Sequence, residues 1–369
     1  MRFREILSGR ELTAWIDLTD RIYHCSRFVP PVRQHIRATF DAFGRFDTRA
    51  AFYCVEDDSG NILARTTVHS NDALDAKLGE RIQLFGYTEF VEDFTAFEVL
   101  VRGIKEIARD DDRTKLFGPS NLLPNECGGV ISAGFGQRGF LDSAYNPAYY
   151  PEFYARAGFT ERFSSATYIC DNLQSGQDPD SVLRFDDARM EPEKLEIHYA
   201  ARAQFKTQLK LLQEMLNASF SARPYYTAIT CDELSKRMEG LSYLLDERLL
   251  VYLTHENRPV AFVVCIPDVS PFLAQVNGNL SLFNQIRLVA TQKRYRREAI
   301  ILIGGVVPNC EGQGYLRLLM RQVFRNLRSG GYDTVRTTSI ERDNPTARGS
   351  FLKMKGRVLH DLAYYECKL

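Results

Sequence analysis

One stretch of this sequence constrains the fold more than any other. Residues Ala299 to Val307 are almost continuously apolar, which is typical of a central strand covered on both faces. Pro308 ends this run, and a turn containing Gly312 and Gly314 leads into residues 315–329, where apolar side chains recur at helical spacing. The sequence therefore predicts a buried strand, a glycine-bearing turn and a helix in direct succession.

The turn between this strand and this helix is a candidate site for an anion such as a pyrophosphate. Glycines let the backbone approach a ligand closely. The unpaired N–H groups in the first turn of a helix favour a negative charge at the same place. A plain connection uses the same geometry, with Gly312 and Gly314 only satisfying backbone angles. The turn by itself leaves both interpretations open.

The chain of 369 residues is long enough for two domains with separate cores. Each half predicts a helical opening, a β-hairpin, a central strand, a helix, a further strand, a short helix and a last strand. Polar and turn-forming residues at 172–182 indicate the boundary. We therefore expect an α/β (α+β) protein with an N-terminal lobe at 1–172 and a C-terminal lobe at 180–369.

The individual elements follow from hydrophobic periodicity and turn residues. In the first half the predicted helices cover 11–24, 94–108 and 149–157, and the predicted strands cover 51–55, 62–68, 82–89 and 115–119. In the second half a long helical region is predicted at about 192–248, with strands at 249–254, 260–266, 299–307 and 334–340, helices at 315–329 and 345–355, and a terminal strand.

Composition narrows the function classes. Lys and Arg together number 47, as do Asp and Glu, so no overall attraction to nucleic acid is expected. The eight cysteines are scattered without metal-ligand spacing, which indicates free thiols and no metal site. Charged residues stand at Met1–Glu5 where a signal peptide needs an apolar core, and no apolar run of membrane-spanning length occurs. A cytoplasmic protein is expected.

A second pattern follows the next predicted strand. Glu341 to Ala347 and Phe351 to Gly356 lie where GNAT enzymes carry an Asn-x-x-Ala helix. Together with the turn they resemble the GNAT superfamily, and the whole chain resembles a bacterial family of two-lobe GNAT proteins that includes bacterial ceramide synthase-like N-acyltransferases. The motifs that carry this wider resemblance are Phe28-Val29-Pro30-Pro31-Val32-Arg33, Gly118-Pro119-Ser120-Asn121, Tyr145-Asn146-Pro147-Ala148-Tyr149-Tyr150, Pro267-Asp268 and Asn277-Gly278.

The resemblance implies a tandem GNAT fold with two mixed central sheets flanked by helices. It implies an acyl-CoA or acetyl-CoA donor, or the phosphopantetheine of an acyl carrier protein, with Val306 and Val307 orienting the thioester. The expected contacts to the pyrophosphate come from Glu311, Gly312, Gln313, Gly314, Tyr315 and Leu316. Two positions depart from the family pattern: Glu311 replaces the usual Arg or Gln, and Leu316 replaces a small residue. These departures keep the carrier-protein donor open.

Acyl transfer to an amine needs a base for the ammonium proton and an acid for the departing thiolate. Tyr154 matches the acid position of the family in the first lobe, where a packed core position is the alternative. In the second lobe Phe351 stands at that position and cannot donate a proton, while the first lobe lacks the Gly-x-Gly turn. Each lobe thus carries part of a site.

Three further residues are catalytic candidates. Glu89 and Glu341 lie at ends of predicted strands, where they are candidate bases. The alternative for Glu89 is an ordinary surface carboxylate. The alternative for Glu341 is an ion pair with a nearby arginine. Asn344 is a further candidate, although its place before Pro345 is that of a helix N-cap.

The resulting hypothesis is an N-acyltransferase with a small-molecule or lipid-like amine acceptor in the cleft between the lobes. An aminoacyl-tRNA-dependent transferase is a first alternative, because the basic run Lys293 to Arg297 could contact the phosphates of a tRNA. A nucleic-acid partner is expected only in that case. A non-catalytic protein that binds an acyl thioester is a second. The acceptor, the acyl chain length and the oligomeric state are not predicted.

Overall fold

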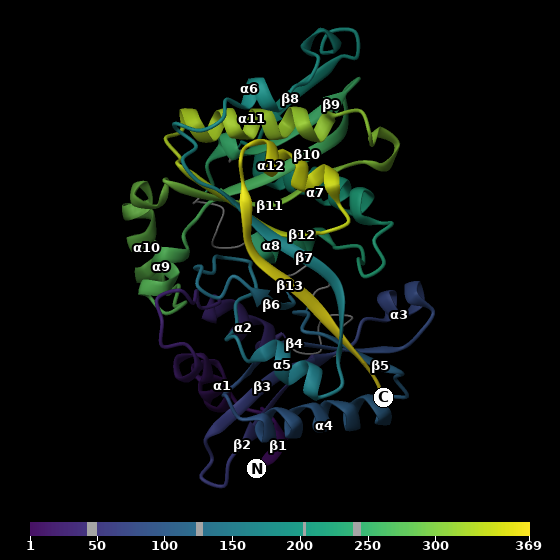
Figure 1. The fold of residues 1–369 in the computed structure, drawn as a ribbon, viewed down its shortest axis with the longest axis vertical. Helices are drawn as coiled ribbons and strands as arrows, with labels where there is room; N and C mark the ends of the chain where they lie inside the picture. The colour runs from purple at the N-terminus through teal and green to yellow at the C-terminus, as the bar shows by residue number, and fades with distance from the viewer. Residues whose placement is uncertain (43–49, 123–127, 202–203, 239–244) are drawn as a thin grey trace. The chain divides into compact units, whose positions relative to one another are not determined.

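The computed structural model describes residues 1–42, 50–122, 128–201, 204–238 and 245–369 (Figure 1). The described chain forms two compact units. Unit 1 comprises Met1–Ser165, Leu273–Ser281 and His360–Leu369, and unit 2 comprises Ala166–Phe272 and Leu282–Leu359. The strands belong to one 13-stranded mixed sheet, and each unit is described below by its own stretch of that sheet and the helices packed against it.

The sheet of unit 1 runs in the order β1-β2-β3-β4-β5, continued by the end of the terminal strand β13. Neighbours are antiparallel except β4 and β5, which are parallel, and β6 also pairs with β13. The strands are β1 (Arg2–Glu5), β2 (Ala50–Glu56), β3 (Ile62–His69), β4 (Ile82–Phe90), β5 (Lys115–Gly118), β6 (Val130–Ala133) and β13 (Arg357–Lys368). The helices are α1 (Gly9–Ile22), α2 (Arg33–Asp41), α3 (Asp72–Leu78), α4 (Phe94–Asp110) and α5 (Tyr150–Arg156).

Side-chain alternation along the strands of unit 1 builds a core on each face of its sheet. Cys54 belongs to a cluster with residues of α1 and α2. Its neighbour Val55 belongs to a second cluster with residues of α4 and α5. The start of α1 is fixed by a capping box, in which the side chains of Ser8 and Glu11 each accept from the other's backbone N–H. Both faces of the sheet are therefore covered.

The sheet of unit 2 runs in the order β8-β9-β10-β11-β12-β7. Strands β8 to β11 are antiparallel neighbours, and β11 and β12 are parallel. The strands are β7 (Thr160–Cys170), β8 (Leu195–Tyr199), β9 (Leu250–His255), β10 (Arg258–Pro267), β11 (Glu298–Val306) and β12 (Thr334–Glu341). The helices are α6 (Pro179–Val182), α7 (Phe205–Phe220), α8 (Cys231–Met238), α9 (Ser270–Gln275), α10 (Leu282–Thr291), α11 (Tyr315–Ser329) and α12 (Pro345–Lys353).

The predicted helical region beginning at about residue 192 is wrong at its start. Residues Leu195–Tyr199 form strand β8, which pairs with β9 so that Leu195 lies opposite His255 and Ile197 opposite Leu253. Leu195 is buried while Glu196 is exposed, and this period of two decides for a strand once β9 supplies the partner. The described helices of the region are α7 and α8, and 202–203 and 239–244 lie outside the described residues.

Two remaining sequence features are resolved by the structure. The described cysteines are free thiols, as predicted, and Cys127 lies outside the described residues. In the parts of the chain that the structure covers, no helix has the length and apolar character needed to cross a bilayer.

Candidate functional site

The junction between β11 and α11 in unit 2 is an exposed turn with a free backbone edge. Gly312 and Gly314 have positive φ angles of 78° and 84°, and Gly314 is the N-cap of α11 without a side chain to cap it. Within the described ranges, no group accepts a hydrogen bond from the N–H groups of residues 312–317. Six successive donors therefore lack an acceptor among the described residues, which is the arrangement that binds anions at helix N-termini.

Side chains stabilise this turn through a carbonyl oxygen of its backbone and leave its N–H groups unused. Arg189 Nη1 donates to the carbonyl oxygen of Gln313 at 3.0 Å, and Arg189 Nε pairs with the Glu193 carboxylate at 2.5 Å. The Tyr315 hydroxyl donates to Glu193 Oε2 at 2.8 Å. The hydrogen bond from Arg189 lowers the pKa of Glu193, whereas burial raises the pKa of Tyr315 to about 12. A charged carboxylate thus fixes the turn while its N–H side stays open.

The other residues predicted to hold the donor lie around the same turn. Glu311 is exposed at its start. Leu316 is partly buried and packs against the core of unit 2, with Cδ1 3.4 Å from where a Cβ on Gly304 would stand. This large side chain therefore points into the core and not toward the turn. Val306 ends β11, and the N–H of Val307 already donates to the Val260 carbonyl at 2.9 Å.

The corresponding junction in unit 1, between β4 and α4, has the opposite chemistry. No glycine lies between Phe90 and Phe94. Asp93 is the N-cap of α4, and its Oδ1 accepts from the N–H of Thr95 at 2.8 Å and of Ala96 at 3.4 Å. The helix N-terminus therefore carries its own negative charge, which disfavours a bound phosphate.

A polar cluster lies at the end of β4. Glu89 Oε2 accepts from the Tyr23 hydroxyl at 2.7 Å and from the Tyr150 hydroxyl at 2.8 Å. Tyr23 follows α1 and Tyr150 begins α5, so three elements of unit 1 bring these groups together. Burial raises the pKa of Glu89, while the charge of Arg65 and the two hydroxyl donors act in the opposite direction. The carboxyl is thus placed to exchange a proton nearer neutral pH than an exposed glutamate.

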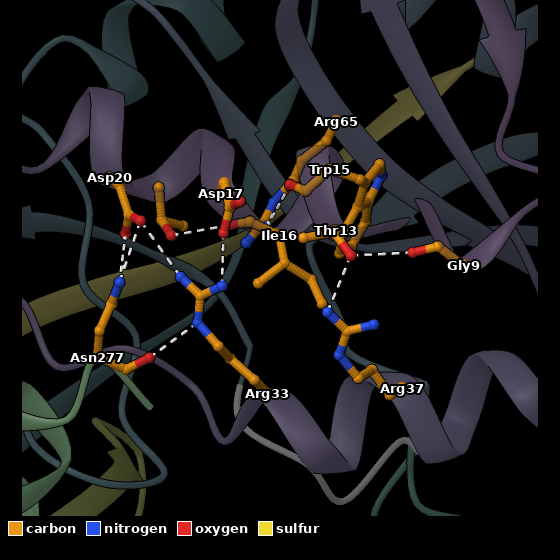
Figure 2. A network of polar contacts seen from close by, with 11 residues as sticks. Gly9, Thr13, Trp15, Ile16, Asp17, Asp20, Arg33, Arg37, Arg65 and Asn277 are labelled. Carbon is orange, nitrogen blue, oxygen red and sulfur yellow. Dashed lines mark hydrogen bonds and ion pairs between the residues drawn. The ribbon is translucent and has the colours of Figure 1, made fainter. Parts of the chain in front are cut away.

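The positive charge of Arg65 lowers the pKa of the Glu89 carboxyl, against the effect of burial. It is almost fully buried, and its guanidinium lies 4.3 Å from the centre of the Trp15 ring. Its Nη1 donates to the carbonyls of Trp15 at 2.8 Å and Ile16 at 3.1 Å, as Figure 2 shows. These bonds fix a positive charge inside unit 1, which favours the ionised form of Glu89.

Tyr154 lies deeper in the same unit. Its side chain is 0% exposed and stacks on Tyr365 at 4.7 Å, with Phe97 edge-on at 5.0 Å. The hydroxyl makes no hydrogen bond of normal geometry among the described residues, although Thr88 is close enough to affect its pKa, which burial raises well above the ordinary value. Tyr154 is therefore a neutral phenol in an aromatic core, and its role as an acid stays a prediction.

The candidates at the end of β12 have simpler surroundings. Glu341 pairs with Arg223 at 2.5 Å, and both side chains are 42% exposed. Asn344 Oδ1 accepts from the N–H of Ala347 at 3.1 Å and caps α12 at Pro345, which confirms the predicted N-cap. Their catalytic roles stay predictions.

Comparisons with known proteins agree with this architecture. No family model matches the chain. It is 20% identical over 291 residues to Protein YghO of Escherichia coli K12, covering 78% of this chain and 73% of that protein. It is 24% identical over 205 residues to the bacterial ceramide synthase of Caulobacter vibrioides, covering 56% of this chain and 53% of that protein. The second match thus spans about half of that relative.

Solved structures match over the whole chain. A tandem GNAT protein from the clavulanic acid biosynthesis pathway superposes with a TM-score of 0.60 at 12% identity, covering 100% of this chain and 98% of that one. The chain has the tandem GNAT fold. A GCN5-related N-acetyltransferase from Sphaerobacter thermophilus superposes with a TM-score of 0.54 at 10% identity, over 100% and 95% of the two chains. The predicted fold class is confirmed.

Sequence reasoning missed several residues around the GNAT central strands. Tyr150 lies in the motif Tyr145–Tyr150, which the sequence marks only as part of a family resemblance, although the Tyr150 hydroxyl donates to Glu89. No local signal marks Tyr23 or Arg189, because each acts on a partner far along the chain. Only the fold reveals such pairs.

Two of the resemblance motifs support the geometry of β4 in the first GNAT unit. Tyr87 interrupts β4 with a φ of 48°, and its N–H donates to the side-chain oxygen of Asn121 at 3.0 Å. A Cβ on Gly86 would stand 2.1 Å from the Ser120 carbonyl oxygen, so only glycine allows this approach. The Gly118–Asn121 motif therefore shapes the strand that carries Glu89.

Two further motifs meet in the network of Figure 2. Arg33 donates from its backbone N–H to the Gly278 carbonyl at 3.0 Å and from Nε to the Asn277 carbonyl at 2.8 Å. Its Nη1 pairs with Asp17 at 2.5 Å, and Asn277 Nδ2 donates to Asp20 at 3.0 Å. These contacts fix the segment Leu273–Ser281 within unit 1, which is a structural role.

Proposed function

We propose that this protein is a GNAT-type N-acyltransferase that takes an acyl group from a coenzyme A thioester and transfers it to an amine. The observation that carries the proposal is the row of six unpartnered N–H groups at residues 312–317, at the turn where the fold family holds its pyrophosphate. Arg189 and Glu193 stabilise the turn without occupying these donors. A phosphopantetheine arm on a carrier protein uses the same donors.

The reaction is an acyl transfer that moves one proton from the amine and one to the thiolate. The amine nitrogen attacks the thioester carbonyl carbon, the carbon–sulfur bond breaks, and an amide and a thiol result. Glu89 takes the proton lost by the attacking nitrogen, because its raised pKa suits it to that task. Tyr154 remains the candidate for protonating the departing thiolate. The acceptor is a small-molecule or lipid-like amine.

Donor binding is tested at Gly314. In Gly314→Asp the new carboxylate competes for the free N–H groups and repels phosphate, much as Asp93 does at α4. A Cβ there meets only Phe185, at 3.6 Å, so space is available and the positive φ is the structural cost. Gly314→Ala carries the same backbone cost without the charge and is the matched control. We expect Gly314→Asp to weaken coenzyme A binding by about a hundredfold relative to Gly314→Ala, measured by isothermal titration calorimetry.

Equal affinities for the two variants contradict donor binding at this turn. Tyr154→Phe serves as a second control and leaves the affinity for coenzyme A unchanged, because its hydroxyl lies in the core of unit 1.

Transfer itself is tested by thiol release. Acyl-CoA donors of increasing chain length, and an acylated carrier protein, are combined with a panel of amines, and the products are identified by mass spectrometry. Amine-dependent thiol release with amide formation supports the proposal. Donor binding without thiol release from any pair identifies a non-catalytic thioester-binding protein and overturns it.

A further inference from the structure

Helix α10 exposes an unusual amount of apolar surface. Leu282 is 73% exposed, Phe283 74%, Ile286 62% and Val289 39%. At helical spacing these four side chains fall within an arc of about 120°. Leu288, on the opposite side of the helix, is buried. The helix is therefore fixed by one face and presents a second apolar face to its surroundings.

The chain around this helix is strongly basic. From Val269 to Arg297 the sequence contains no aspartate or glutamate. It contains five basic residues, namely Arg287, Lys293, Arg294, Arg296 and Arg297. Four of them are exposed, namely Arg287, Lys293, Arg294 and Arg297. The exposed apolar row thus lies next to cations that no acid within the segment neutralises.

The segment leading into α10 is held firmly. Asn277 accepts from and donates to the Arg33 and Asp20 network of Figure 2. Closer to the helix, Gln34 Nε2 donates to Asn279 Oδ1 at 2.7 Å and Gln34 Oε1 accepts from the Leu280 N–H at 2.8 Å. Leu280 lies two residues before the first residue of α10, so the backbone that leads into the helix is held by hydrogen bonds.

We propose that α10 and the basic run after it dock this protein on an anionic lipid bilayer. Leu282, Phe283 and Ile286 enter the boundary between headgroups and acyl chains, and the exposed lysine and arginines contact lipid phosphates. A bilayer is favoured over a protein partner because the exposed apolar row lies beside exposed cations with no acid in the segment, which complements an anionic lipid surface. Acyl chains adapt to such side chains without matching pockets. The inference is independent of the proposed reaction.

Vesicle co-sedimentation of the full chain tests the docking. Vesicles of phosphatidylcholine with phosphatidylglycerol are compared with phosphatidylcholine alone, and binding is expected only to the anionic vesicles, falling with added salt. Two triple variants are each expected to lower the partition coefficient by about a hundredfold. The first removes apolar side chains and combines Leu282→Ser, Phe283→Ser and Ile286→Ser. The second removes charge and combines Lys293→Gln, Arg294→Gln and Arg297→Gln. Circular dichroism and thermal unfolding confirm that each variant is folded.

Matched controls come from exposed residues elsewhere. A double variant, Leu7→Ser with Leu352→Ser, removes apolar side chains that are similarly exposed. A triple variant removes the same amount of positive charge from exposed positions and combines Arg10→Gln, Arg102→Gln and Arg109→Gln. Both leave vesicle binding unchanged under the proposal. An equal loss in the controls and the α10 variants overturns it, because binding then reflects general surface charge or hydrophobicity.

A spectroscopic probe reports insertion directly. The single native tryptophan, Trp15, is buried in unit 1 and gives a constant background. In Phe283→Trp, a blue shift of the emission on adding anionic vesicles places residue 283 in an apolar medium. No shift overturns the proposal. A shift that instead follows protein concentration or an added acylated carrier protein identifies a second copy or a carrier protein as the occupant and also overturns it.

Discussion

The two strand-to-helix junctions at the centre of the units differ in charge although they occupy the same place in the fold. In unit 1, β4 has Glu89 as its penultimate residue and α4 begins at the carboxylate of Asp93. In unit 2, β11 has Gly305 as its penultimate residue and α11 begins at the bare backbone of Gly314. The junction of unit 1 carries negative side-chain charge, whereas the junction of unit 2 offers backbone N–H groups that favour a bound anion. The same place in two similar folds therefore favours opposite charges in the two units.

The largest expected effect separates the two strand-end glutamates. Glu89→Gln is expected to lower kcat by about a hundredfold to ten-thousandfold, because it removes a general base. Glu341→Gln, which removes a partly exposed ion pair with Arg223, is expected to change kcat by less than about threefold. Steady-state thiol release measures both. Coenzyme A affinity is the control, and equal losses of kcat in the two variants would contradict the proposed role of Glu89 as the base.

A smaller effect concerns the acidity of Glu89. The Tyr23 and Tyr150 hydroxyls hold its raised pKa down, so Tyr23→Phe or Tyr150→Phe lets that pKa rise further. The base works only when ionised, and activity therefore increases as the pH rises through this pKa. Each variant is expected to move the acidic limb of the pH profile of kcat/KM to higher pH.

Tyr149→Phe is the matched control for this shift. Its hydroxyl donates to the Phe90 carbonyl at 2.6 Å and makes no bond to Glu89. The acidic limb is expected to stay in place. A limb that moves equally in all three variants assigns the effect to packing of the aromatic cluster and not to the carboxylate.

The smallest effect concerns the helix caps. Asp93→Ala removes two hydrogen bonds at the start of α4 and is expected to lower the free energy of unfolding by about 1 kcal/mol. Urea unfolding measures the change. Coenzyme A affinity is expected to stay constant, and a tighter complex in this variant would show that the junction of unit 1 also accepts the donor.

Local patterns predicted most of the elements and the turn. The apolar run before Pro308 predicted β11 to within one residue at each end, and the periodicity from Tyr315 to Ser329 predicted the bounds of α11. Buried strands and amphipathic helices both leave strong patterns in a local sequence. The Asn344 cap followed from its place before Pro345. Leu195–Tyr199 was misread because its strand depends on pairing with β9, which no local window contains.

The candidate site was only partly predictable for the same reason. Glu89 and the turn at Gly312 to Gly314 are visible in the sequence, because each is marked by its neighbours. The Tyr23 hydroxyl reaches Glu89 from 66 residues away and Arg189 reaches Gln313 from 124 residues away. Contacts at such separations are decided by tertiary packing, and a single sequence does not specify them.

The terminal strand has a consequence for how the chain is made. Residues 115–118 of β5 in unit 1 pair with residues 365–368 of β13, so that Gly118 lies opposite Tyr365 and Lys115 opposite Lys368. During synthesis, all of unit 2 is polymerised before residues 365–368 are added. The β5 edge of unit 1 therefore lacks this partner while residues 119–364 are added, and an unpaired strand edge is a site for aggregation.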